Sequence, residues 1–267
     1  MTSRIVIHAA LCLAFAMPAA FFGCGSSRTA VTVAGSTAFQ PFAEKLADQF
    51  MAAHSSVVIT VQGGGSAVGV QSALSGAAQI GMADLVALPE EARELSSFVV
   101  AKDGIAVVVH SQNPVDNLST DQVRDIFNGN IRNWTEVGGA NRPITVVSRE
   151  AGSGTRSSFE AITGGIRLTR DAIVQDSNGT VRETVANDEN AIGYLSHGLL
   201  NEKIKALSID GYPCTDEAIL DGKYPLVRPV FFLTKGDPEG EVKAFIEYVL
   251  SPEGQRTITE SGLLPAK

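Results

Sequence analysis

The sequence is poor in charged residues and in histidine, and each shortage excludes a class of protein. Charged side chains make up 19% of the 267 residues and hydrophobic ones 44%, so the chain is neither disordered nor a polyelectrolyte. Its formal net charge of -8 argues against nucleic-acid binding, because phosphate backbones select basic surfaces. The four histidines are scattered and no carboxylates cluster. This pattern has no metal-ligand spacing, and we expect neither a metal nor another cofactor.

Cysteine is scarce too, and two of the three cysteines stand near the N-terminus. A short basic start precedes an apolar run over residues 5–22, which is followed by Gly23 and Cys24. A charged start, an apolar middle and a small-residue end are typical of a secretory signal. The alternative is a single transmembrane anchor, which Pro18 and the Gly-Ser-rich segment after the run disfavour. We therefore expect a signal peptide over residues 1–23.

The end of this signal, from Phe21 to Cys24, resembles the lipobox of bacterial lipoproteins, although Phe21 stands where that pattern prefers leucine. The resemblance implies that Cys24 is diacylated and becomes the new N-terminus of a tether over residues 24–29. The protein is then exported and anchored in the periplasm or at the outer face of the cell membrane. Cys214 is left alone, cannot form an intramolecular disulfide and is expected to be an inert thiol in a loop.

Short apolar runs alternate with helical patterns through the rest of the chain. The runs 31–34, 57–61 and 79–82 are rich in β-branched residues and predict strands, and the segments between them have the spacing of helices. This order predicts an α/β fold built from strand–helix–strand units.

Three helices are predicted to begin at turns rich in glycine and serine. The turns are residues 35–37, 63–66 and 149–156, and the last one contains Arg149. A helix N-terminus presents unpaired N–H groups and a partial positive charge, so it binds anions without a basic protein surface. Hydroxyl donors and the fork of an arginine suit the same ligand. The three turns together predict an oxyanion cage, although each turn alone could be a simple helix cap.

Two long extended segments are predicted to cross between two lobes. They cover residues 98–110, with a break at 102–104, and residues 224–234. After them, Pro238 opens a helix, and the apolar residues Val242, Phe245, Ile246, Val249 and Leu250 are expected to share one face of it.

Other glycine and serine motifs are incomplete. A dinucleotide fingerprint would need glycine at Val68, and a phosphate-binding P-loop needs a lysine, yet none stands between Lys45 and Lys102. The nucleophile elbow of serine hydrolases lacks its first glycine before Ser153. These gaps disfavour a nucleotide-binding protein and a serine hydrolase.

Seven segments resemble, in order and spacing, the phosphate-binding proteins of bacterial ABC phosphate importers. The resemblance runs from about Val31 to the C-terminus. It implies a class II periplasmic-binding-protein fold, in which two α/β lobes joined by two crossing segments enclose one dehydrated phosphate ion in a cleft. It also implies a monomer that delivers phosphate to permease subunits. The segments are Val33–Thr37, Gln62–Ser66, Gly81–Asp84, Ile126–Trp134, Arg149–Arg156, Ile192–Leu195 and Gly222–Pro229. The expected lobes are residues 30–104 with 226–267 for lobe 1, and residues 105–225 for lobe 2.

The same resemblance implies which residues hold the ion. Arg149 supplies the countercharge, and Asp84 is an acceptor among donors. Because phosphate keeps a proton at neutral pH and sulfate has none, Asp84 is expected to select phosphate. Many members of that family have an acidic residue where Ala151 stands, and in this chain the neighbour of Arg149 is Glu150. The expected hydroxyl and backbone donors are Ser36, Thr37, Ala38, Ser66, Ser153, Gly154 and Thr155.

Two other functions stay open. An exported phosphatase of the same fold would need a nucleophile beside a base, and Ser36, Thr37 or Ser153 could be that nucleophile. A sensor or surface protein would keep the anion site without transport.

Overall fold

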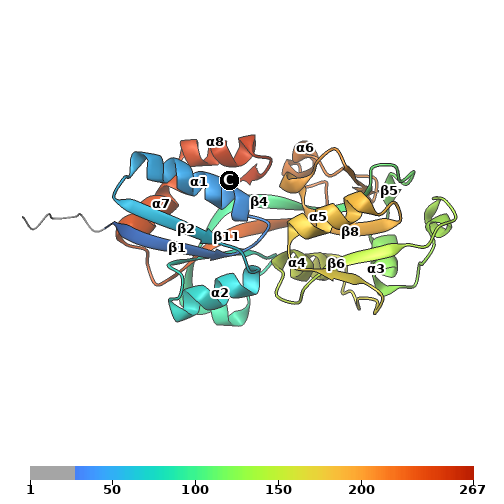
Figure 1. The fold of residues 1–267 in the computed structure, drawn as a ribbon, viewed down its shortest axis with the longest axis horizontal. Helices are drawn as coiled ribbons and strands as arrows, with labels where there is room; N and C mark the ends of the chain where they lie inside the picture. The colour runs from blue at the N-terminus through green and yellow to red at the C-terminus, as the bar shows by residue number, and fades with distance from the viewer. Residues whose placement is uncertain (1–27) are drawn as a thin grey trace, which may run out of the picture.

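The computed structural model describes residues 28–267 of the chain (Figure 1). The predicted signal peptide and Cys24 lie outside the described residues, and so does most of the tether. No helix within residues 28–267 is both long enough and apolar enough to cross a membrane.

Strands and helices alternate as predicted, and they form two lobes side by side in Figure 1. The strands are β1 (Thr29–Gly35), β2 (Val57–Gln62), β3 (Ile80–Asp84), β4 (Leu95–His110), β5 (Asn117–Leu118), β6 (Thr145–Arg149), β7 (Ile173–Gln175), β8 (Ala191–Ser196), β9 (Ile204–Ala206), β10 (Ser208–Ile209), β11 (Val227–Lys235) and β12 (Leu264–Pro265). The α-helices are α1 (Gln40–Ala53), α2 (Ser66–Ser75), α3 (Thr120–Asn128), α4 (Gly154–Ile162), α5 (Asn178–Asn187), α6 (Asp216–Leu220), α7 (Gly240–Leu250) and α8 (Pro252–Glu260). Short 3-10 helices cover Glu90–Glu94, Trp134–Val137 and His197–Leu199.

One continuous sheet joins the lobes, in the order β2-β1-β3-β11-β4-β8-β6-β7. The pairs β1·β2 and β1·β3 in one lobe are parallel, as are β6·β7 and β6·β8 in the other. The two strands at the centre, β4 and β11, are antiparallel to each other and run between the lobes (Figure 1). Parallel strands end at the same edge of a sheet, so the turns that follow them open helices at neighbouring places.

The predicted break at residues 102–104 is wrong, because β4 runs through it without interruption. The polar residue responsible for the prediction, Asp103, lies directly opposite Arg228 of β11 in the antiparallel register. The two opposite charges compensate each other across the strands, so Asp103 lies buried inside the sheet.

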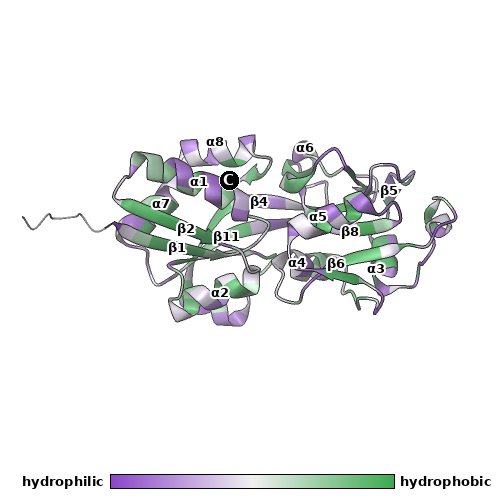
Figure 2. Cartoon of the chain, in the orientation of Figure 1, coloured by the Kyte–Doolittle hydropathy of each residue, from purple (hydrophilic) through white to green (hydrophobic). Residues whose placement is uncertain are grey.

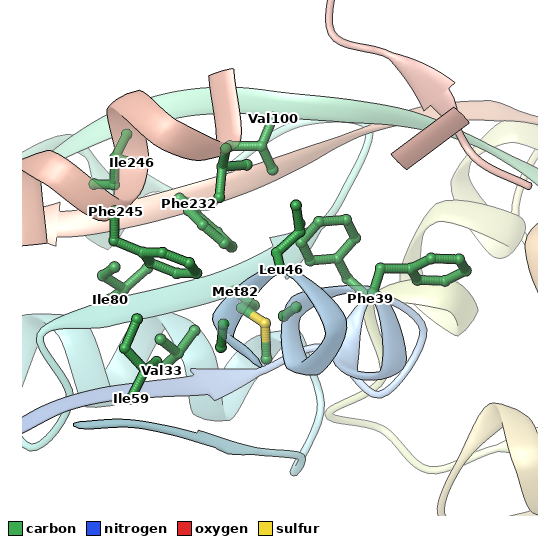
Figure 3. Close-up of a cluster of buried hydrophobic side chains, with 14 of the residues drawn as sticks. Val33, Phe39, Leu46, Ile59, Ile80, Met82, Val100, Phe232, Phe245 and Ile246 are labelled. Atoms are coloured by element: carbon green, nitrogen blue, oxygen red, sulfur yellow. The ribbon is translucent and has the colours of Figure 1, made fainter. Parts of the chain in front are cut away.

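The core of the first lobe packs α1 and α7 onto the central strands (Figure 3). Phe39 and Phe232 meet edge to face at 5.8 Å between ring centroids, within the favourable range for aromatic pairs. In α7 the predicted face buries Phe245, Ile246 and Val249, but Leu250 is 39% exposed. Helix α7 ends at Leu250, so the last residue of the expected stripe lies beyond the packed part of the helix.

The second lobe is built around a cluster of three aromatic side chains. Phe159 of α4 stacks on Tyr194 of β8 with centroids 4.0 Å apart, and Phe127 of α3 contacts both rings. The strands of both lobes are mainly apolar, whereas many helix surfaces are polar, as the hydropathy colours of Figure 2 show. The residue boundaries expected for the lobes stay a prediction.

Candidate functional site

Four helices begin where the two lobes meet, and each follows a strand of the sheet. Helix α1 follows β1, α2 follows β2, α4 follows β6 and α5 follows β7. Three of these helix starts were predicted, and the start of α5 at Asn178 was not. Thr37, from the turn before α1, contacts residues of both β6 and α5, so helix starts from the two lobes come together.

Arg149 ends strand β6 and is 1% exposed. Its Nε donates to Glu150 Oε2 at 2.9 Å and its Nη2 donates to Glu150 Oε1 at 2.8 Å, which is a bidentate fork. The same Nη2 lies 3.3 Å from Thr37 Oγ1, its acceptor in the other lobe. The hydroxyl of Tyr194 accepts from the backbone N–H of Arg149 at 3.3 Å and so helps to fix the end of the strand.

The remaining guanidinium nitrogen of Arg149 has no hydrogen-bond partner. Nη1 is buried and unpaired within residues 28–267. A buried donor without an acceptor costs free energy, roughly 1–3 kcal/mol or more for a charged group. Two other buried side-chain atoms lack partners, on Asn190 and His197, but the Arg149 atom alone is on a group that is always charged. Arg149 therefore has capacity for an acceptor, next to Thr37.

Asp84 ends strand β3 and lies opposite this arginine in the network. It is 1% exposed, and its Oδ1 accepts from Ser66 Oγ at 2.9 Å. Ser66 also accepts from the backbone N–H of Asp84 at 3.1 Å, so the two residues are joined twice. Thr155 Oγ1 lies 3.5 Å from Asp84 Oδ2. Asn178 connects this side to Arg149, because its Nδ2 lies 3.2 Å from Thr37 Oγ1 and 3.5 Å from Thr155 Oγ1.

The other predicted donors lie at the helix starts. Ser36 Oγ accepts from the backbone N–H groups of Ala38 and Phe39, both at 3.1 Å, in the turn before α1. The expectation that Ser36 or Thr37 caps α1 is wrong, because the N-cap residue is Phe39 and no side chain caps this helix. Ser153 caps α4 by accepting from Arg156 N at 3.2 Å. Both hydroxyls accept in these contacts and keep their own proton to donate. The cap of α4 does not engage the N–H groups of Gly154 and Thr155 that begin the helix.

The lobes touch directly beside these residues. A Cβ atom on Gly154 would stand 2.0 Å from Ser66 Oγ and 2.6 Å from the backbone oxygen of Asp84, so only glycine allows this approach. Ala67 N donates to Gly152 O at 3.2 Å across the same contact. The starts of α2 and α4 are therefore held against each other, and the predicted site residues between them are buried.

A second buried arginine lies behind Asp84. Nη1 of Arg228 is 2.6 Å from Asp84 Oδ2, and its Nε and Nη2 donate to Asp103 Oδ2 at 3.1 and 2.7 Å. Ser196 Oγ donates to Asp103 Oδ1 at 2.8 Å. Burial raises the pKa of Asp103 above its usual range, against the opposing effect of Arg228.

Two further pKa values in this region are raised by burial. The phenol of Tyr194 has its pKa raised to about 12, so it stays protonated beside Ser148, whose Oγ lies 2.8 Å from it. Burial also raises the pKa of the Cys214 thiol to about 12. Cys214 is unpaired in the described chain and lies in the loop before α6, and the raised pKa fits the predicted inert thiol.

Two hollows on the described surface differ in how they relate to the predicted site residues. One of about 240 Å³ is lined by the start of α2 and the turn before α4, including Ser66 and Ser153, and lies at the mouth of the lobe contact. Another, of about 470 Å³, is lined mainly by apolar residues such as Phe98, Leu250 and Pro265. The second hollow is distant from the buried polar network and lacks its donors.

The network includes three residues that the sequence reasoning did not assign, Asn178, Asp103 and Arg228. Asn178 stands in a strand–polar turn–helix pattern like the three that were recognised, so the same signal could have found it. Asp103 and Arg228 each stood out as a polar residue in an otherwise apolar crossing segment. Only the register of β4 with β11 places them opposite each other, and register is not visible in a single sequence.

Comparisons with known proteins agree with this arrangement. The family model of the PBP superfamily domain matches residues 24–253. The phosphate-binding protein PstS of Bacillus subtilis is 36% identical over 240 residues, which are 88% of this chain and 80% of that protein. This chain belongs to the PBP superfamily and, within it, to the PstS family.

Solved structures of relatives support the fold. A protein from Clostridium perfringens, assigned as a phosphate ABC transporter substrate-binding protein and crystallised with bound phosphate, is 37% identical with a TM-score of 0.87. The match covers 90% of this chain and 100% of that one. An ABC-type phosphate transport receptor from Vibrio cholerae is 34% identical with a TM-score of 0.75, over 88% of this chain and 99% of that one. The predicted two-lobed periplasmic-binding fold is confirmed.

Proposed function

We propose that this chain is an exported receptor that binds one inorganic phosphate ion between its lobes and delivers it to the permease subunits of an ABC importer. The observation that carries the proposal is the unpaired, buried Nη1 of Arg149, which lies among four helix N-termini. Such a group needs an acceptor, and an oxyanion supplies several. The relatives named above, which are phosphate-binding proteins and phosphate transport receptors, support phosphate as that anion.

Each predicted residue has a role in this proposal. Arg149 and the helix starts donate to phosphate oxygens, and Glu150 orients the guanidinium through its bidentate contact. Asp84 accepts the proton that phosphate keeps at neutral pH, and Ser66 supports it through the two hydrogen bonds that join them. The proposed phosphate contacts are Ser36, Thr37, Ala38, Ser66, Asp84, Arg149, Ser153, Gly154 and Thr155, with Asn178 added from the geometry.

The delivery step follows from the contact between the lobes. Because Gly154 and Ser66 pack against each other over the buried site, phosphate must enter and leave in a form of the protein whose lobes are further apart. A transporter can then recognise the closed form, since ligand binding changes which form is populated. The protein acts as a monomer, and a lipid on Cys24 keeps it near the membrane that holds the permease.

The geometry favours binding over hydrolysis. A phosphatase needs a nucleophile within hydrogen-bond reach of a base. Within the described residues, the hydroxyl oxygens of Ser36 and Ser153 accept from backbone N–H groups, and that of Thr37 accepts from Arg149 and Asn178. None of these partners is a histidine or another base. We therefore propose a receptor that performs no chemistry on phosphate.

Titration calorimetry of the full chain, purified as the cell processes it, tests this function. We expect one phosphate per chain, little binding of sulfate, and no turnover of p-nitrophenyl phosphate. Hydrolysis that increases in proportion to protein concentration would instead favour the phosphatase. Absence of phosphate binding, with a folded protein by circular dichroism, would overturn the proposal.

Membrane fractionation of Cys24→Ala tests the anchor. We expect the variant to be released from the membrane or misprocessed, and unchanged membrane association would contradict lipidation.

A further inference from the structure

Arg228 is a charged residue that the proposed binding reaction does not use directly. Its side chain is 0% exposed, and all three of its guanidinium nitrogens contact protein acceptors. Nη1 contacts Asp84, while Nε and Nη2 contact Asp103. All three nitrogens of Arg228 are therefore engaged with protein acceptors, whereas Nη1 of Arg149 has no partner in the described chain.

The position of Arg228 in the fold connects the ligand site to the strands that cross between the lobes. Arg228 lies on β11 and its partner Asp103 lies opposite on β4, the two central strands. Asp84 ends β3, which is the other neighbour of β11. Arg228 therefore bridges the crossing strands and the carboxylate that faces the proposed ligand site.

Contacts of the Asp84 carboxylate limit where a ligand can reach it. An ionised carboxylate has about four lone-pair positions. Ser66 occupies one on Oδ1, and Arg228 occupies one on Oδ2, where Thr155 is also within 3.5 Å. The carboxylate plane is thus fixed from both ends. Little acceptor capacity remains, and it is directed by the protein.

We propose that Arg228 is a positioning residue that sets the preference of the site for phosphate over sulfate. It acts by holding the Asp84 carboxylate in one orientation, so that its oxygens accept a hydrogen bond from the proton that the ligand carries. This inference rests on the proposed function of the site.

The chemical reason is the high cost of a buried carboxylate without a cation. Without Arg228, the buried carboxylate of Asp84 would keep only hydroxyl partners and would lose the contact that fixes its plane. It would then be free to turn about its side-chain bond. A site rejects an analogue strongly only while its buried acceptor is held where the donor of the correct ligand meets it.

A double substitution separates this role from the overall charge of the site. Arg228→Met with Asp103→Asn removes one positive and one negative charge, so the net charge of the protein is unchanged. Asp84 is then the one carboxylate of the two partners of Arg228 that remains, and it has lost its cation. Asp103→Asn alone keeps the contact between Arg228 and Asp84. Calorimetric titration of the full chain and both variants with phosphate and with sulfate gives the ratio of the two affinities.

We expect the phosphate-to-sulfate ratio to fall by about tenfold or more in the double variant, since the Asp84 oxygens are no longer held toward the proton of the ligand. In Asp103→Asn we expect the ratio to stay within about threefold of wild type, because Asp84 keeps its guanidinium partner. An unchanged ratio in the double variant would overturn the proposal. So would an equal loss in both variants, because Asp103 would then act without the contact between Arg228 and Asp84.

Two further proteins keep the test decisive. Tyr224→Phe removes a buried hydrogen bond to the backbone oxygen of Ile105 and none to Arg228, Asp84 or Asp103, and should leave the ratio unchanged at a comparable loss of melting temperature. If the double variant does not fold, Arg228→Lys replaces it, because lysine keeps the charge but lacks the fork that spans both carboxylates. Its ratio should fall, and an unchanged ratio would contradict the proposal. Wild-type protein that does not bind phosphate would refute the proposed function itself, a result distinct from these.

Discussion

Two buried arginines belong to the network, and they differ in what their partners leave free. Arg149 is paired with Glu150, whose side chain is 32% exposed, and its Nη1 has no partner in the described chain. Arg228 is paired with Asp84 and Asp103, whose side chains are 2% and 1% exposed, and its nitrogens are all engaged. The first arginine is equipped to bind a ligand, and the second to organise the protein around it.

The difference shows how a protein of negative net charge can hold an anion. In the Arg228 region two buried carboxylates share one guanidinium, so the formal charge there is negative and the region adds no attraction for an anion. In the Arg149 region a buried guanidinium nitrogen has no partner in the described chain, and the starts of α1 and α5 come together beside this arginine at Thr37, so donors remain for an anion. Binding strength and binding selectivity are then expected to reside in different residues.

The largest expected effect concerns the stability of the Arg228 region. Arg228→Met leaves Asp84 and Asp103 buried without their cation, and removing one partner of a buried ion pair typically costs about 3–5 kcal/mol. We expect the free energy of unfolding in urea to fall by that amount. Arg142→Ala is the matched control, because its pair with Glu189 is 52% exposed on both side chains and such pairs contribute little. Equal stability of Arg228→Met and wild type would contradict the claim that Arg228 organises the protein while Arg149 binds the ligand.

Arg149→Ala should lower phosphate affinity strongly and the free energy of unfolding only a little, the reverse of Arg228→Met. Losing a charge-assisted contact in a buried site should cost phosphate binding about 2–5 kcal/mol. Stability should change much less than in Arg228→Met, because the partner Glu150 is partly exposed and can be hydrated. Calorimetry and urea unfolding of the same samples measure both quantities. Phosphate affinity within twofold of that of Arg142→Ala would show that Arg149 is not in the site.

A smaller effect is expected at the contact between the lobes. Gly154→Ala places a methyl group where Ser66 Oγ and the oxygen of Asp84 already lie, so the lobes cannot approach fully. We expect phosphate affinity to fall by roughly tenfold or more, the effect of about 1.4 kcal/mol of strain in the closed form. The control is Gly152→Ala in the same turn, where the new Cβ would meet only Ala67 Cβ at 3.6 Å, an ordinary contact. Equal affinities of the two variants would contradict closure at this point.

The smallest effect concerns Cys214, a half-buried acid without a cation beside it in the described chain, and it sharpens the contrast with Asp84 and Asp103. Because the pKa of the Cys214 thiol is about 12, its reactive thiolate is scarce at neutral pH and increases about tenfold for each unit of pH up to that value. We expect alkylation by iodoacetamide of a protein comprising residues 28–267 to accelerate through pH 10 without a plateau. In urea the same rate should level off near the ordinary thiol pKa. A plateau near pH 9 in the folded protein would contradict the burial of this thiol.

Sequence patterns predicted the helix starts well, because the signals there are local. Glycine, serine and a following apolar stripe are enough to place the starts of α1, α2 and α4, and a strand before each one follows from a short apolar run. Arg149 was found for the same reason, since it is the last residue of β6 and stands directly before one of these turns. The start of α5 at Asn178 was missed, although it follows a short strand and a polar turn in the same way.

The Arg228 network depends on contacts between distant parts of the chain, and local patterns do not contain them. Asp103 and Arg228 are 125 residues apart, and their pairing requires the register of β4 with β11. The polar residues near Asp103 instead predicted a break in the strand, because an unpaired charge would end it. The sequence does not show that Arg228 pairs with Asp84. Arg149 was therefore taken as the only positive charge near the ligand.

A crystal structure of the protein grown with phosphate tests the central claim most directly, namely that the free nitrogen of Arg149 and the carboxylate of Asp84 contact the ion from opposite sides. We expect one phosphate between the lobes, with Arg149 Nη1 about 2.7–2.9 Å from one oxygen and Asp84 about 2.5–2.7 Å from another, the usual lengths of charge-assisted hydrogen bonds. Arg228 should keep its contacts with Asp84 and Asp103. A phosphate bound elsewhere, or one that touches Arg228 in place of Arg149, would contradict the account.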